Sequence, residues 1–292
     1  MKKLLFIINP MAGRQQAQTD LYKMVKIFAD HDYEVTVYPT RARLDCTRKV
    51  LEDAGRFDLV ICCGGDGTLN EMVSGMMQRQ DRRPMGYIPL GSTNDLAVSL
   101  RLPTRVEEAA LRAVTGNEFH MDVGTLNDRY FNYIAAFGAF TETSYATPQE
   151  IKNALGHLAY ILEGVKSLGK ILPIHVKITA DDEQFEEDYL FGAVTNTISL
   201  GGVLKLDPEK VLLDDGMYEL LLVKNPTNAL EAQAMLTLMT QNFDGPLVKM
   251  FHASDITFES SHEISWTIDG EYGGTFSHTH ILNNKNAVTL IV

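Results

Sequence analysis

The chain has 292 residues, enough for one large or two modest domains, and its 45% hydrophobic content is ordinary for a soluble globular protein. Its 26 basic and 38 acidic residues give a formal net charge of −12 at pH 7, which argues against a general nucleic-acid-binding protein because such proteins bind phosphates through excess basic residues. No apolar run approaches the roughly 18 residues that a membrane-spanning helix needs.

The first 120 residues alternate between predicted strands and helices. Apolar and β-branched runs predict strands over 3–8, 33–38, 57–63 and 85–90, and amphipathic segments predict helices over about 17–31, 43–55, 69–77 and 105–115. This alternation predicts a parallel sheet with helices on both faces. Cys62 and Cys63 end the third strand and are interpreted as core residues of a protein in the reducing cytoplasm.

The most informative segment, Gly64-Gly65-Asp66-Gly67-Thr68-Leu69-Asn70-Glu71, joins the third strand to a helix. Free N–H groups and the positive end of a helix dipole attract anions at such a junction, and glycine lets the main chain approach phosphate oxygens because it has no Cβ. A loop that only binds phosphate would not favour Asp66, so we predict a magnesium-linked or hydrogen-bonding role for this residue. The alternative is a tight turn whose glycines only permit positive φ.

Two further turns follow other strands of the predicted sheet. Asn9-Pro10-Met11-Ala12-Gly13 comes after the first strand, and Gly91-Ser92-Thr93-Asn94-Asp95 comes after the fourth. Because ligands of open parallel sheets bind beyond the carboxyl ends of the strands, the three turns together predict a phosphate site. Asn94 and Asp95 either cap the following helix or order the site, and both interpretations stay open.

From about residue 121 the sequence changes to short alternating runs, which predict a mainly antiparallel β-sandwich. Two predicted helices, over about 149–169 and 227–241, interrupt these runs. We therefore expect an α/β domain over 1–122 and a β-rich domain over 123–292.

Five elements, in this order, resemble the diacylglycerol kinase catalytic domain family, which includes bacterial lipid kinases and sphingosine kinases. They are the three turns above, then Leu213-Asp214-Asp215-Gly216-Met217 and Ile268-Asp269-Gly270-Glu271. The resemblance implies an ATP-binding domain with a parallel sheet like that of NAD kinase and phosphofructokinase, followed by a β-rich domain that carries acidic catalytic and metal residues. It also implies an ATP- and Mg²⁺-dependent kinase that phosphorylates a lipid hydroxyl, first of all diacylglycerol to give phosphatidic acid.

The resemblance further implies which residues line the ATP site. They are Asn9, Pro10, Met11, Ala12, Gly13, Thr40, Gly64, Gly65, Asp66, Gly67, Thr68, Leu69, Asn70, Glu71, Thr93 and Asn94. Thr40 is included only for its position at the end of the second predicted strand.

Acidic residues carry the remaining roles that the resemblance implies. Asp66 is expected to hold catalytic Mg²⁺, and the Asp215 carboxylate, with carbonyls near Leu212 and Met217, is expected to hold a second, structural Mg²⁺. Asp269 and Glu271 correspond to acids at the reaction centre, where one of them acts as general base toward the substrate hydroxyl. Without the resemblance, Asp214-Asp215-Gly216 is equally a β-turn, and Asp269-Gly270-Glu271 a surface turn with incidental acids.

Several alternatives stay open at this stage. The substrate is diacylglycerol or another lipid, such as phosphatidylglycerol or a sphingoid base; a soluble-substrate kinase such as an NAD kinase and a non-catalytic sensor are the competing functions. We expect a cytoplasmic protein that contacts the membrane surface peripherally, through arginines near 79–83 and 101–105, and a homodimer is left open. We also expect the nucleotide loops and the acids near residue 270 to converge between the two domains.

Overall fold

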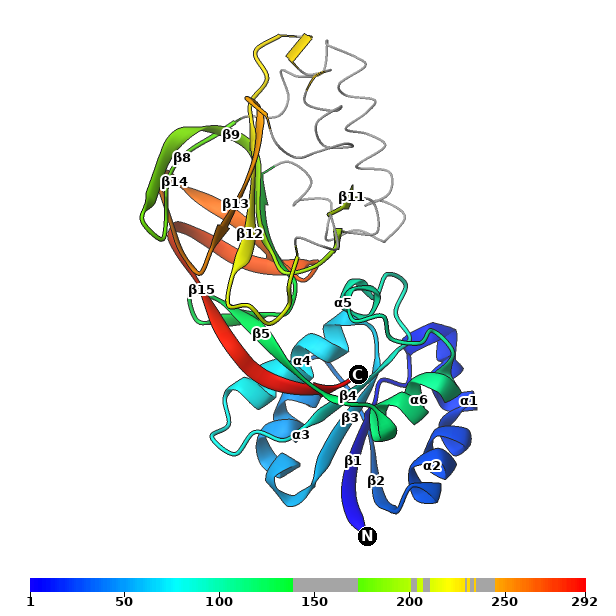
Figure 1. Ribbon diagram of the computed structural model, residues 1–292. Coiled ribbons are helices and arrows are strands. Elements are labelled where there is room, and N and C mark those ends of the chain that lie inside the picture. The colour runs from blue at the N-terminus through cyan, green and yellow to red at the C-terminus, as the bar shows by residue number, and fades with distance from the viewer. Residues whose placement is uncertain (139–172, 201–203, 207–210, 229, 232–233, 235–244) are drawn as a thin grey trace. The chain divides into compact units, whose positions relative to one another are not determined.

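The computed structural model describes residues 1–138, 173–200, 204–206, 211–228, 230–231, 234 and 245–292 (Figure 1). The chain forms two compact units, one of Met1–Val123 with Asn284–Val292 and one of Gly124–Asn283. The sequence predicts a boundary after residue 122, close to the end of the first segment of the first unit, and a second domain that reaches residue 292. Residues 284–292 belong to the first unit, because the end of the last strand pairs with a strand of that unit, Leu290 beside Met85.

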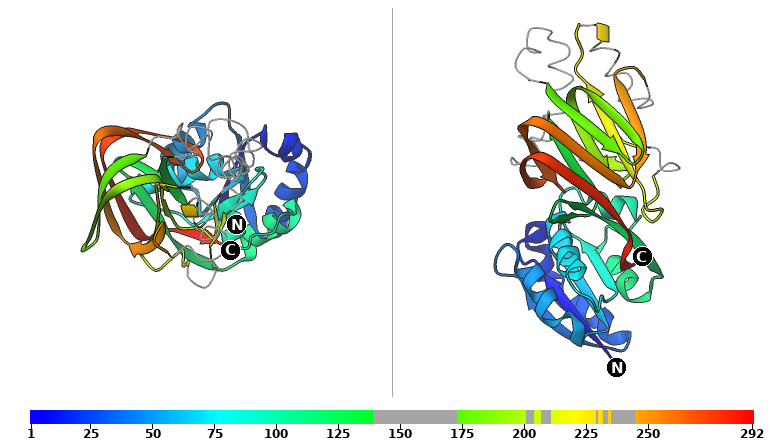
Figure 2. Two further views of the ribbon diagram at one scale, coloured as in Figure 1. Left: turned by 90° about the horizontal axis from the view of Figure 1, so that it is seen from above. Right: turned by 90° about the vertical axis from the view of Figure 1, so that its left-hand side faces the viewer.

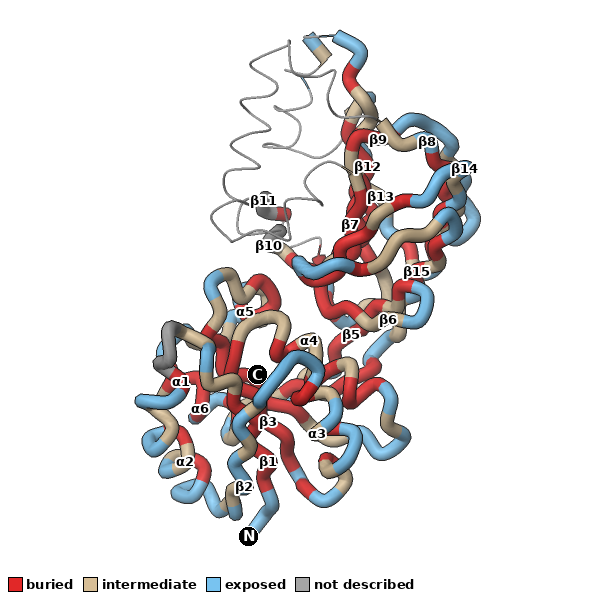
Figure 3. The backbone as a smooth tube through the Cα atoms, turned by 180° about the vertical axis from the view of Figure 1, so that it is seen from behind, coloured by how far each residue is buried: buried red, intermediate tan, exposed pale blue. Residues whose placement is uncertain are grey.

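The first unit is built on a parallel sheet in the order β2-β1-β3-β4. Its strands are β1 (Lys2–Ile8), β2 (Tyr33–Pro39), β3 (Leu59–Gly64) and β4 (Met85–Pro89). Every residue of β3 is buried, as Figure 3 shows, because neighbouring strands and helices cover it. Burial raises the pKa of Cys63 to about 12, and Cys62 is also a buried free thiol, which confirms that both are core residues; Cys46 is buried as well.

Helices cover both faces of this sheet. They are η1 (Ala12–Gln15), α1 (Gln16–Thr19), α2 (Leu21–Asp30), α3 (Asp45–Asp53), η2 (Ala54–Arg56), α4 (Asp66–Met77), α5 (Asp95–Ser99) and α6 (Val106–Thr115). Figure 1 shows α2 and α6 on one face and α3 and α4 on the other, and each pair is in contact. Phe28 of α2 packs edge-on against Phe6 of β1, with ring centroids 5.2 Å apart, so an apolar helix stripe meets the sheet as its periodicity predicts.

The second unit is mainly antiparallel. It contains β6 (Arg129–Phe131), β7 (Ile134–Gly138), β8 (Ile174–Ala180), β9 (Glu183–Thr195), β10 (Ser199–Leu200), β11 (Leu204–Lys205), β12 (Tyr218–Lys224), β13 (Val248–Ala253) and β14 (Asp255–Ile268). The chain passes between the units within β5 (Glu118–Leu126) and β15 (Glu271–Ile291). Figure 2 shows the strands of this unit curving around a common interior, where Trp266 lies 5.0 Å from Phe137 and 4.9 Å from Phe258 between ring centroids.

The predicted helix over 149–169 lies outside the described residues, as does most of the predicted helix over 227–241. Among the residues that are described, none of the helices combines the length and the apolar character needed to cross a membrane.

Candidate active site

The turn after β1 is held against the glycine run that follows β3. The N–H of Asn9 donates to the carbonyl of Cys63 (2.9 Å), and its side-chain Nδ2 donates to Thr68 Oγ1 (3.3 Å). The Asn9 Oδ1 in turn accepts from the N–H of Met11 (3.0 Å). Asn9 therefore fixes the path of its own turn and joins it to α4.

Thr40 lies at the carboxyl end of β2, beside the end of β1. Its N–H donates to the carbonyl of Ile8 (2.9 Å). The position is the one that the sequence predicts, at the sheet edge where the turns after β1, β3 and β4 also lie. The role of Thr40 in binding nucleotide stays a prediction.

The glycine run and the turn after β4 touch through their main chains. A Cβ on Gly65 would lie 3.2 Å from the Cα of Gly91, and a Cβ on Gly91 would lie 2.8 Å from the Cα of Gly65. A Cβ on Gly64 would lie 2.3 Å from Thr68 Oγ1. Any side chain here would separate the two turns, so glycine is required for close approach.

A main-chain N–H of one turn orients the acid of the other. Asp66 begins α4, and its Oδ2 accepts the N–H of Asn94 (2.9 Å). Asn94 has φ of 52°, and its side chain accepts from the N–H of Gly91 (2.8 Å) and donates to the Gly91 carbonyl (2.9 Å). Asn94 makes no side-chain cap bond to α5, so the capping interpretation is wrong for this residue, and the ordering interpretation stays a prediction.

Among the residues that are predicted to line the ATP site, two have side chains that stabilise the fold. Leu69 is buried, and the Glu71 carboxylate accepts the N–H groups of Leu44 (2.7 Å) and Cys46 (3.1 Å) at the start of α3. Negative charge is favourable at a helix N-terminus. Glu71 thus supports the segment that follows Thr40, a role with no local sequence signal because its partners lie 27 and 25 residues away.

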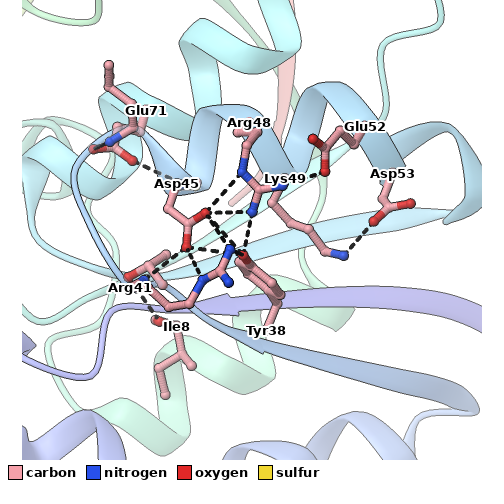
Figure 4. Close-up of polar contacts among 12 residues, drawn as sticks. Ile8, Tyr38, Arg41, Asp45, Arg48, Lys49, Glu52, Asp53 and Glu71 are labelled. Atoms are coloured by element: carbon pink, nitrogen blue, oxygen red, sulfur yellow. Dashed lines mark hydrogen bonds and ion pairs between the residues drawn. The ribbon is translucent and has the colours of Figure 1, made fainter.

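The sequence analysis also missed Asp45, which organises the same segment (Figure 4). Its carboxylate accepts the N–H of Arg41 (2.9 Å), the Arg41 Nε (3.2 Å) and the Arg48 Nη2 (2.7 Å), and the Tyr38 hydroxyl donates to it at 3.1 Å. The Arg41 guanidinium, with these other donors, holds the pKa of Asp45 well below its usual range. Asp45 is only 7% exposed, so the network fixes the chain directly after Thr40.

We expect Asp45→Asn to lower the free energy of unfolding by about 1–2 kcal/mol at pH 7, because hydrogen bonds to a buried charge are lost while both guanidiniums remain partly solvated. A depressed folded-state pKa contributes stability above the unfolded value of about 4, and this contribution disappears as the pH falls through the folded value. Thermal unfolding of both proteins from pH 7 to pH 3 should show the difference shrink below about pH 4. Asp30→Asn, in the exposed pair with Lys26, is the control and should change little; a pH-independent difference for Asp45→Asn would contradict the assignment.

The acids near residue 270 occupy different environments. Asp269 (φ 47°) and Gly270 (φ 81°) form a two-residue turn between the paired residues Ile268 and Glu271, as in a type I′ hairpin. Asp269 is 6% exposed, so the interpretation as a surface turn with incidental acids is wrong for it, whereas Glu271 is exposed.

The buried Asp269 carboxylate binds main-chain donors of the segment that leads into β7. Its Oδ2 accepts the N–H of Asn132 (2.7 Å), and its Oδ1 accepts those of Tyr133 (3.0 Å) and Ile134 (3.2 Å). The Asp269 N–H donates to the carbonyl of Ile134 (2.9 Å). Asp269 therefore anchors the turn that carries Glu271.

The segment before β12 forms a tight turn around Asp215. The Asp215 Oδ1 accepts the N–H of Met217 (2.8 Å), and the Met217 carbonyl accepts from Asn283 Nδ2 (3.2 Å). Burial raises the pKa of nearby Glu219 to about 8. Within the described part of the chain no three His, Cys, Asp or Glu side chains converge as a metal site, so a cation here would depend on one carboxylate, carbonyl oxygens and water, a donor set that suits Mg²⁺.

Nearly the whole chain is covered by matches to known protein families. Residues 3–126 match the model of the diacylglycerol kinase catalytic domain, and residues 140–291 match that of the YegS C-terminal NAD kinase beta sandwich-like domain. A diacylglycerol kinase of Bacillus subtilis (strain 168) is 33% identical over 296 residues, covering 98% of this chain and 97% of the relative. This chain belongs to the diacylglycerol kinase family.

Other members of the diacylglycerol kinase family are similarly close. A diacylglycerol kinase of Staphylococcus saprophyticus is 32% identical over 276 residues, covering 94% of this chain and 90% of the relative. A crystal structure described as a diacylglycerol kinase from Bacillus anthracis str. Sterne has a TM-score of 0.78 at 25% identity, covering 99% of this chain and 96% of that one. A second Bacillus anthracis structure has a TM-score of 0.85 at 26% identity, with the same coverage. The predicted lipid-kinase family and its two-domain architecture, with a C-terminal sandwich-like domain, are thus confirmed.

The arginines that the sequence analysis offers for membrane contact are engaged within the kinase. Arg79 donates to the carbonyl of Leu51, Arg82 Nη1 to that of Ala287 (2.8 Å), and Arg83 Nη2 to that of Gly55 (3.0 Å). Arg105 pairs with Glu108. These guanidiniums contact backbone carbonyls and an acid, and their role at a membrane surface stays a prediction.

Proposed function

We propose that this kinase transfers the γ-phosphate of ATP to the hydroxyl of diacylglycerol and gives phosphatidic acid. The observation that carries the proposal is the Asp269-Gly270-Glu271 turn, in which a buried carboxylate with three main-chain donors presents an exposed one. The diacylglycerol kinases of Bacillus and Staphylococcus that match nearly the full chain support the choice of lipid.

The nucleotide is assigned to the turns at the carboxyl edge of the parallel sheet. The loops 9–13 and 64–71, with Thr93, would line the phosphates, and the helix dipole of α4 would favour their charge. Thr40 would border the same site at the end of β2.

Oxygen ligands for Mg²⁺ are present at both predicted positions. Asp66 has its Oδ2 oriented by Asn94, and Asp215 has its Oδ1 oriented by the N–H of Met217; the carbonyls of Leu212 and Met217 would complete the second site. Carboxylate and carbonyl oxygens fit this cation, and Mg²⁺ bound to ATP neutralises the negative charge of the phosphates.

We assign the general base to Glu271 and a positioning role to Asp269. Both oxygens of Asp269 already accept N–H donors, so protonation would break bonds that hold the turn. Glu271 begins β15 on the exposed side of the turn and can accept the hydroxyl proton as the phosphoryl group moves.

The test is phosphoryl transfer from labelled ATP with Mg²⁺ to mixed micelles that contain diacylglycerol, phosphatidylglycerol or sphingosine, with NAD and lipid-free micelles as separate reactions. We expect label in phosphatidic acid. Label only in another lipid would support a lipid kinase with a substrate other than diacylglycerol. Label in NAD would establish a soluble substrate. No transfer from protein that binds ATP would overturn the proposal.

We also propose a peripheral contact with the membrane, because the acceptor hydroxyl lies at a bilayer surface. With a net charge of −12, the kinase should sediment with diacylglycerol-containing neutral vesicles more than with the same vesicles carrying anionic lipid at low salt. The opposite preference would indicate a local basic surface that outweighs the net charge.

A further inference from the structure

A buried tyrosine hydroxyl lies between the two glycine-bearing turns that follow β3 and β4. Tyr87, in β4, is 2% exposed. Its hydroxyl is 3.3 Å from the carbonyl of Gly64 and 3.2 Å from Oδ1 of Asn94. Because a phenol has one proton, these two acceptors share it, and the single group contacts both turns.

Each acceptor holds its own turn in place. The Gly64 carbonyl also accepts the N–H of Leu90 (2.7 Å), which joins the ends of β3 and β4. The side chain of Asn94 is fixed through both its oxygen and its nitrogen by Gly91. The Tyr87 hydroxyl is the third group that contacts this amide, and it comes from inside the sheet.

The orientation of Asn94 matters because of its main chain. Asn94 is in the left-handed region, and in this conformation its N–H points at Asp66 Oδ2 (2.9 Å). A non-glycine residue keeps such a conformation only when its surroundings hold it there. The hydrogen bonds of the Asn94 side chain supply this restraint, so a change at Tyr87 would reach the Asp66 carboxylate through Asn94.

We infer that Tyr87 is a positioning residue of the nucleotide site, whose hydroxyl orients Asn94 and, through it, Asp66. A phenylalanine would fill the same apolar volume in β4 but could not contact Gly64 or Asn94. The hydroxyl is therefore not required for packing, and its burial is balanced by bonds to these two turns. The inference rests on the proposed ATP site.

The test is Tyr87→Phe, with Tyr189→Phe as the matched control. Tyr189 is also 2% exposed but belongs to the core of the second unit. Calorimetric titration with Mg·ATP should show the affinity of Tyr87→Phe fall roughly 5- to 10-fold, the equivalent of about one hydrogen bond. In turnover assays the KM for ATP should rise by a similar factor while the KM for lipid stays unchanged, and Tyr189→Phe should change neither constant.

A second variant tests the route through Asn94. Asn94→Gly keeps the left-handed backbone conformation at low cost but removes the amide. In that background Tyr87→Phe should no longer change Mg·ATP affinity, because the two changes act on one path. Additive effects of the two substitutions would overturn this path.

The other outcomes are equally decisive. Unchanged Mg·ATP affinity in Tyr87→Phe, or an equal loss in Tyr189→Phe, would leave only a packing role. If the unsubstituted protein binds Mg·ATP but phosphorylates no lipid, the proposed function fails. The calorimetric titrations with Mg·ATP still decide the role of Tyr87 in that case. If the unsubstituted protein does not bind Mg·ATP, both proposals fall.

Discussion

Replacement of Glu271 by glutamine is expected to lower kcat at least about 100-fold, the usual minimum contribution of a positioned general base. Glutamine has nearly the same shape but cannot accept the proton that leaves the substrate hydroxyl. Because Glu271 is exposed at the beginning of β15, we expect the melting temperature to stay within about 2 °C of the original. The affinity for Mg·ATP should also persist, since the nucleotide is assigned to other residues.

The measurements are kcat with saturating ATP and diacylglycerol, calorimetric Mg·ATP binding and thermal unfolding. Glu263→Gln, which removes a negative charge from an exposed position of β14, controls for the change in net charge. Retention of more than about a tenth of the original kcat in Glu271→Gln would show that this carboxylate is not the base.

Replacement of Asp269 by asparagine is expected to reduce both stability and turnover. Asparagine offers one oxygen where the carboxylate offers two, so at least one of the N–H groups of Asn132, Tyr133 and Ile134 loses its acceptor in a buried site. Loss of a buried hydrogen bond to a charged acceptor costs about 1.5–3 kcal/mol, and an NH₂ group directed at an N–H donor adds to this cost. We expect the free energy of unfolding to fall by about 3 kcal/mol, and kcat to fall as the turn that presents Glu271 loosens.

Denaturant unfolding measures the loss of stability. The result is compared with that for Glu271→Gln, which also removes one negative charge, two residues away. The two variants separate the roles of anchor and base. An Asp269→Asn protein as stable as the original would contradict the anchor. A stable Asp269→Asn protein without turnover, together with an active Glu271→Gln protein, would instead make Asp269 the base.

Much of the first unit was predictable because its signals are local. Runs of apolar and β-branched residues predicted β1 to β4, and helical periodicity predicted α2, α3, α4 and α6 within a few residues. The start of α4 was placed late, at Leu69 rather than Asp66, because Asp66 and Gly67 look like turn residues in the sequence. The division near residue 122 assigned the last strand to the second domain, since nothing in Asn284–Val292 indicates that it pairs beside β4.

Long-range contacts account for the residues that the sequence analysis missed or left open. Tyr87 looks like any strand residue until its hydroxyl is found beside Gly64, 23 residues earlier. Asn94 fits a helix cap from its position alone, and only the structure shows that its side chain instead contacts Gly91 and Tyr87. Arg79, Arg82 and Arg83 form a basic cluster in the sequence, but backbone carbonyls from distant segments bind them.

The sequence by itself determined the chemistry that is available, namely glycine turns at the ends of parallel strands and a late pair of carboxylates. Residue type and spacing set these features. It could not decide which carboxylate is the anchor. Asp269 and Glu271 are both acids in one short turn, and they differ only because the main chain of residues 132–134, 135 to 137 positions away, brings its N–H groups to Asp269. The tertiary structure therefore decides which of the two acids is buried, because a buried carboxylate is stable only where such donors surround it.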